Sequence, residues 1–94
     1  MERKKLTTEE TNEKLKDLSG WTIENAHLKK RFDFADFAAS LAFVNRAGAI
    51  AEKLDHHPDI KFGWGYAEFS TTTHDRNGLT DFDFALAKEI DAIS

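Results

Sequence analysis

The chain of 94 residues contains no cysteine, one proline and one methionine. Without cysteine it can form neither a disulfide framework nor a thiolate nucleophile or thiolate zinc site. No apolar run approaches the ~18 residues of a membrane-spanning helix, and the charged start Met1–Lys5 lacks the apolar stretch of a signal peptide. We therefore expect a soluble, cytoplasmic protein without a membrane partner.

The chain also lacks an excess of positive charge. Thirteen Lys and Arg stand against seventeen Asp and Glu, which gives a formal net charge of −4. A net negative charge opposes binding to the phosphate backbone of nucleic acids. We therefore expect no direct nucleic-acid partner.

The length fits one domain, residues 1–94, because a second core would need a longer chain. Hydrophobic residues make up 40% of the sequence and include eight Phe and two Trp, which is enough for a core. A chain this short buries only about 60–65% of its unfolded surface, so an oligomeric contact would add to its stability.

Two helices are predicted in the first half of the chain. The first begins at Thr7, which stands three residues before Glu10 in a capping box, and it ends at Gly20. The second covers residues 36–54, where apolar residues recur at intervals of three and four. Pro58 disfavours helical geometry in the residue before it, so this helix should stop at or just before residue 56.

A third helix is predicted to begin at Thr80, with Asp83 at its N3 position, and to run to Ile93. The segments between the helices alternate apolar and polar residues or are rich in β-branched and aromatic ones, which is typical of strands. They form two predicted hairpins, with strands near residues 21–24 and 28–34 and near residues 60–64 and 66–73.

The order helix, hairpin, helix, hairpin, helix predicts a two-layer α+β sandwich, with three helices on one face of a four-stranded antiparallel sheet. Such a sheet has two exposed edge strands, which are commonly closed by pairing with another subunit. We expect a homodimer or homotetramer.

The stretch "LDHHPD", residues 54–59, places two of the four histidines side by side at the predicted helix exit. Histidine is the side chain that most readily exchanges a proton near neutral pH, so His56 and His57 suit proton transfer, metal binding or a purely structural role. Adjacent side chains diverge by about 100° on a helix and 180° on a strand, which makes the two rings poor joint metal ligands.

The pattern Glu52-x-x-x-His56-His57-Pro58, followed by Trp64, His74 and Asp83, resembles the signature of the pterin-4a-carbinolamine dehydratases. The segments "AEKLDHHPD", "TTH" and "GLTDFDFALA" carry the same resemblance, which spans roughly residues 21–91. The chain departs from the commoner family pattern at Gly65, Arg76 and Asn77.

The resemblance implies removal of water from a 4a-hydroxytetrahydropterin, with no metal, nicotinamide or other cofactor. It implies that His56, His57 and His74 form the acid–base set, and it leaves open which of them is the acid. The other implied site residues would bind or frame the substrate or orient a histidine, and they are Asp55, Thr73, Asp83 and Trp21. An aromatic amino-acid hydroxylase would be the functional partner of such an enzyme in tetrahydrobiopterin recycling.

Other interpretations of these residues remain open. Asp83 also fits a helix cap, and Trp21 fits the core or an interface. Glu52 fits either a solvated carboxylate or a helical i,i+4 partner of His56. In animal members of the family the same fold also serves as a dimerisation partner of a transcription factor, and the apolar helix face over residues 37–44 would suit such a binding module. Three histidines at matching spacing favour catalysis over that alternative.

Overall fold

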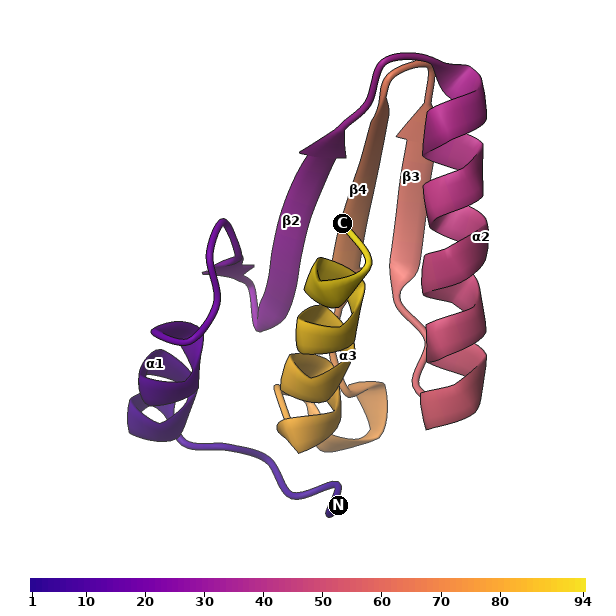
Figure 1. Cartoon of the computed structure of the whole chain (residues 1–94). Coiled ribbons are helices and arrows are strands. Elements are labelled where there is room, and N and C mark those ends of the chain that lie inside the picture. The colour runs from indigo at the N-terminus through magenta and orange to yellow at the C-terminus, as the bar shows by residue number, and fades with distance from the viewer.

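The computed structural model describes residues 1–94 and contains three α-helices and a four-stranded sheet (Figure 1). The sheet is antiparallel throughout, with strand order β1-β2-β4-β3. The α+β class and the antiparallel four-stranded sheet are therefore confirmed. The elements are α1 (Thr8–Leu15), β1 (Thr22–Glu24), β2 (His27–Asp33), α2 (Phe37–Leu54), β3 (Asp59–Gly63), β4 (Tyr66–Thr71), a short 3-10 helix η1 (His74–Arg76) and α3 (Asp81–Ala92).

The two long helices cover one face of the sheet. In Figure 1, α3 lies in front of β4, α2 lies beside β3, and α1 stands apart next to the first hairpin. Alternate residues of the strands point toward the helices, so that Phe32 and Phe69 are buried. On the opposite face Glu68 lies in register between Arg31 of β2 and Lys61 of β3, and this face is polar.

The helix starts follow the sequence signals. Thr7 and Thr80 both form capping boxes, and the side chain of Asp36 caps α2. The first helix ends earlier than predicted, at Leu15, because the following residues form tighter turns with hydrogen bonds to carbonyls three residues back. Gly20 lies beyond these turns with φ +82°.

Residues with positive φ make the hairpin turns. Asn25 and Ala26 both adopt left-handed geometry between β1 and β2, as a two-residue hairpin turn with matching twist requires. Gly65 has φ +83° between β3 and β4, so the residue at this position must tolerate the left-handed region, which glycine and asparagine do best.

The core forms where α2 and α3 meet the sheet, and it consists of Leu6, Trp21, Leu28, Phe32, Phe43, Ala47, Ala51, Ala67, Phe69, Leu79, Phe84, Leu86, Ala87 and Ile90. Packing is aromatic at its centre, with the Phe43 ring 4.8 Å from Phe32 and 5.9 Å from Phe69 between centroids. None of the helices is long and apolar enough to cross a membrane.

Candidate active site

The end of α2 turns the two adjacent histidines in different directions. The helix stops at Leu54, and Asp55 takes left-handed geometry with φ 51°. The chain then bends back, with the backbone N–H of His56 bonded to the Ala51 carbonyl at 3.1 Å. As a result the His56 side chain is only 5% exposed, whereas that of His57 is 55% exposed and pairs through Nε2 with Glu52.

The buried partner of His56 is Asp83, in the first turn of α3. The Asp83 side chain is fully buried, and its Oδ1 lies 2.6 Å from His56 Nε2. Thr71 donates its hydroxyl to the same oxygen at 2.7 Å. The hydroxyl of Thr73 and the backbone N–H of Thr80 donate to Oδ2 at 2.8 and 3.0 Å. Asp83 thus joins β4, the segment after it, α3 and the histidine turn in one network.

These contacts fix the charge of Asp83. Burial by itself raises the pKa of this carboxyl, but the hydrogen bonds from His56, Thr71, the Thr80 backbone and Thr73 outweigh burial and hold the pKa below its ordinary value. A carboxylate accepts only, so His56 Nε2 carries the proton that it donates to Asp83. In the neutral ring, Nδ1 is then left as an acceptor.

A polar cavity of about 300 Å³ opens beside His56, and no hydrophobic residue lines it. Its volume is at the lower end of the range of small-molecule sites. His74, at the start of η1, is exposed and lies with its ring edge-to-face to His27, with centroids 6.3 Å apart. The lining residues are Arg3, Asp55, His56, His57, Thr72, Thr73, His74 and Asp75.

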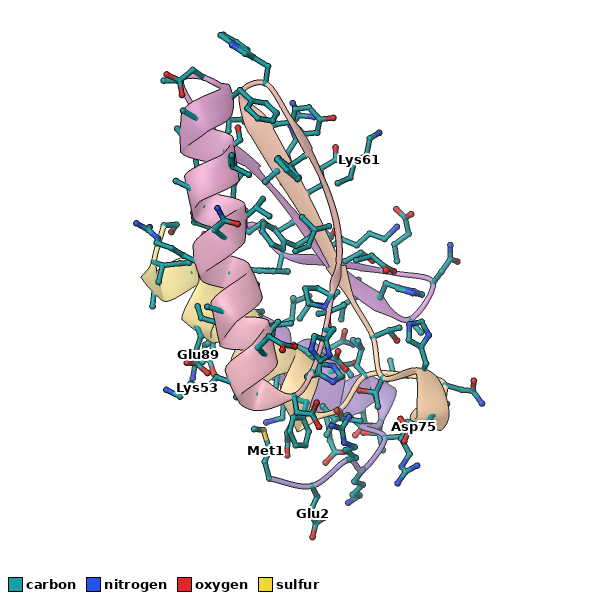
Figure 2. The ribbon with its side chains drawn as sticks, turned by 90° about the vertical axis from the view of Figure 1, so that its right-hand side faces the viewer. Met1, Glu2, Lys53, Lys61, Asp75 and Glu89 are labelled. Carbon is teal, nitrogen blue, oxygen red and sulfur yellow. The ribbon has the colours of Figure 1, made fainter.

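The N-terminal segment also reaches this cavity, which the sequence did not indicate. Arg3 Nη2 donates to the Asp55 carbonyl at 2.9 Å, and its Nη1 lies 3.4 Å from His56 Nδ1. Arg76, one of the departures from the commoner family pattern, donates through Nε to the Arg3 carbonyl at 2.6 Å. Figure 2 shows the start of the chain, labelled at Met1 and Glu2, at the same end of the molecule as Asp75.

The structure therefore brings together His56, His57, His74, Asp55 and Thr73 around one cavity, with Asp83 behind His56. The Asp55 side chain has no hydrogen bond to a histidine, and Asp83 and Glu52 are the carboxylates that pair with the imidazoles. Trp21 does not line the cavity. It is buried in the core with its indole N–H bonded to Asp91 at 3.0 Å.

Comparison with known protein families gives one match over nearly the whole chain. Residues 4–93 match the family model described as pterin 4 alpha carbinolamine dehydratase. The chain belongs to this family. The resemblance seen in the histidine signature is thereby confirmed.

Curated relatives carry the same family name in provisional form, as pterin-4-alpha-carbinolamine dehydratases. The one from Rubrobacter xylanophilus is 44% identical over 94% of this chain and 83% of its own length. The one from Metallosphaera sedula is 40% identical over 95% and 93% of the two chains.

Two solved structures share the dehydratase fold. A crystal structure from Brucella melitensis, described as a transcriptional coactivator/pterin dehydratase, has a TM-score of 0.91 and 35% identity, covering 95% of this chain and 97% of its own. A pterin dehydratase-like protein described as a RuBisCO assembly factor in the alpha-carboxysome has a TM-score of 0.65 and 28% identity, covering 78% and 84%. The fold is therefore found in proteins with more than one described role.

Proposed function

We propose that this protein removes water from a 4a-hydroxytetrahydropterin to give the quinonoid dihydropterin, by acid–base catalysis with histidines. The observation that carries this proposal is the buried Asp83–His56 pair at the wall of a cavity that His57 and His74 also line. Family membership supplies the pterin as substrate class. The product would return to a reductase in tetrahydrobiopterin recycling, alongside an aromatic amino-acid hydroxylase in the cytoplasm.

In this mechanism His56 is the base. Its Nε2–H is held by Asp83, so the lone pair on Nδ1 takes the proton from the ring nitrogen N5 beside the reacting carbon. Asp83 stays ionised and stabilises the imidazolium that forms, as a carboxylate does behind a catalytic histidine.

The acid is one of the exposed histidines, His57 or His74. It protonates the departing hydroxyl while the carbon–oxygen bond breaks. A double bond then forms between the ring carbon and N5, and water leaves. Each well-placed acid or base contributes about 10²–10⁴ in rate.

The purified protein is expected to accelerate dehydration of a freshly generated 4a-carbinolamine and to keep its full rate after exhaustive chelation. The Nε2 atoms of His56 and His57 point to different carboxylates, so the two rings do not converge on one metal ion. Proton transfer by histidines also needs no Lewis acid. The test is the rate of quinonoid dihydropterin formation followed by absorbance. Loss of activity with chelator, and its return with zinc or iron, would contradict the proposed chemistry.

The protein is further proposed to be a homodimer or homotetramer. Strands β1 and β3 are the two edges of the sheet, and each has a neighbouring strand on one side only. Phe37, Leu41 and Trp64 are large apolar side chains that are exposed, with Trp64 at 72%. Light scattering at micromolar concentration should give a multiple of the single-chain mass of 10.7 kDa. A constant mass near 10.7 kDa across that range would refute the oligomer.

The same exposed apolar residues favour a second candidate function, a non-catalytic binding module of the coactivator or assembly-factor type. Phe37 and Leu41 lie at the start of α2, and the Phe37 ring is 5.8 Å from that of Phe62 on β3. A protein that fails to dehydrate the carbinolamine, while a partner protein binds through this face, would favour the module over the enzyme.

A further inference from the structure

The segment Met1–Lys5 lies outside every helix and strand, yet hydrogen bonds fix it beside the histidine cavity. The Arg3 carbonyl accepts from Arg76 Nε at 2.6 Å, and the Leu6 N–H donates to the Leu79 carbonyl at 2.8 Å. The Arg3 guanidinium lies over the Phe82 ring, 4.5 Å from its centroid, and also donates to the Asp55 carbonyl. Both the backbone and the side chain of Arg3 are therefore held in place at the cavity wall.

Arg3 and His56 place a hydrogen-bond donor next to an acceptor. A guanidinium only donates, through five N–H groups, and His56 Nδ1 accepts because Nε2 donates to Asp83. The separation of Arg3 Nη1 and His56 Nδ1 is 3.4 Å, beyond the usual 2.7–3.2 Å of such bonds. Because this bond is long and weak, each group is available to a ligand. The complementary ligand edge carries an acceptor directly beside a donor.

We propose that Arg3 and His56 together recognise the edge of the tetrahydropterin ring that carries the 4-oxo group and N5–H. The two groups are neighbours on that edge, one an acceptor and the other a donor. Arg3 donates to the 4-oxo oxygen, and His56 Nδ1 accepts from N5–H. This inference rests on the proposed function, and it makes Arg3 the residue that selects a 4-oxo ring and aligns the N5–H bond with the base.

The test uses 6-methyltetrahydropterin, which has both groups but no 4a-hydroxyl and so cannot be dehydrated, and its 2,4-diamino counterpart, whose 4-substituent is an amino donor. Binding is measured by calorimetry without oxygen. The wild-type protein should bind the 4-oxo compound at least about 10-fold more tightly, because a hydrogen bond from a charged donor is stronger than one between neutral groups and the amino group offers Arg3 no acceptor. Arg3→Ala should lose about 10-fold or more for the 4-oxo compound and about 3-fold or less for the diamino compound.

Two further variants sharpen the result. Arg3→Lys should recover part of the preference, since an ammonium donates but lacks the planar fork of the guanidinium. Lys4→Ala removes the neighbouring exposed cation and should leave both affinities unchanged. If the wild type dehydrates its substrate while Arg3→Ala keeps the full preference for the 4-oxo ring, the role of Arg3 is refuted and the proposed function stands. A wild type that neither binds the tetrahydropterin nor dehydrates the carbinolamine refutes both.

Discussion

Replacing both His56 and His57 with alanine is expected to slow dehydration by about 10⁴-fold or more, well beyond the loss in either single variant. Each group contributes about 10²–10⁴, and groups that act as a unit are not additive. His57→Ala should cost about 10²-fold or less, because His74 lines the same cavity and is also a candidate acid. His56→Ala should cost more than His57→Ala, since only His56 is backed by the buried carboxylate of Asp83. The measurement is the dehydration rate of freshly generated carbinolamine.

Effects on folding must be separated from effects on catalysis in this series, because His56→Ala also removes one of the hydrogen-bond donors to the buried Asp83 carboxylate. His56→Gln keeps an N–H donor for Asp83 but cannot transfer a proton, so it should stay folded and still lose activity. His27→Ala is the matched control. This fourth histidine lies beside His74 but does not line the cavity, and its loss should leave the rate nearly unchanged. A double variant that is folded by circular dichroism and retains nearly the wild-type rate would show that the pair is structural.

Asp83→Asn is expected to lower the free energy of unfolding by about 3 kcal/mol or more, because a hydrogen bond to a buried charged group contributes about 1.5–3 kcal/mol and several such bonds to this carboxylate are lost or weakened. The amide would direct its own N–H groups at donors that now bond to a carboxylate, among them the Thr73 hydroxyl and the Thr80 N–H. Total stabilities of small domains are about 5–15 kcal/mol, so the loss is large. Urea denaturation of the two proteins at pH 7 measures it.

The pH dependence of stability gives an independent view of the same residue. The pKa of Asp83 is lower in the folded state than its ordinary value, so the carboxylate stabilises the fold above about pH 4. This contribution is lost as the pH falls through the folded-state pKa. The wild type should therefore lose stability below about pH 4 more steeply than Asp83→Asn.

Asp81→Asn serves as the control for Asp83→Asn. Asp81 stands two residues earlier in the same helical turn, and its ion pair with Lys14, at 3.1 Å, is about 40% exposed on both sides. Pairs of this kind contribute about 0–1 kcal/mol. Equal losses in the two variants would show that the effect comes from the helix N-terminus and not from the buried network.

Local rules were enough to predict the elements of the fold. The capping boxes at Thr7 and Thr80 and the stop enforced before Pro58 depend on residues within a few positions of each other, so they can be identified in the sequence. The end of the first helix was placed too late, at Gly20, because the chain tightens into turns after Leu15 without any glycine or proline to signal it.

The histidine signature could also be identified without the structure, because it consists of residue types at fixed spacings along the chain. This signature was enough to identify the family. Which partner each histidine would take was not visible in it. Glu52 stands four residues before His56 and suggested a helical pair, but the left-handed geometry of Asp55 ends the helix first. His56 is therefore turned inward, and Glu52 pairs with His57 instead.

Only the tertiary structure decided the working geometry of the site. Asp83 is 27 residues from His56, and Arg3 is 53 residues from it, so no local pattern connects them. His56 and Asp83 meet because the packing of α2 and α3 on one sheet places the end of one helix next to the start of the other, and burial there makes a charged carboxylate stable only when every oxygen is hydrogen-bonded. Arg3 joins them because the N-terminal segment is held by Arg76 and by the Phe82 ring. The same packing puts Trp21 in the core, where its indole bonds Asp91, and leaves the cavity to polar residues.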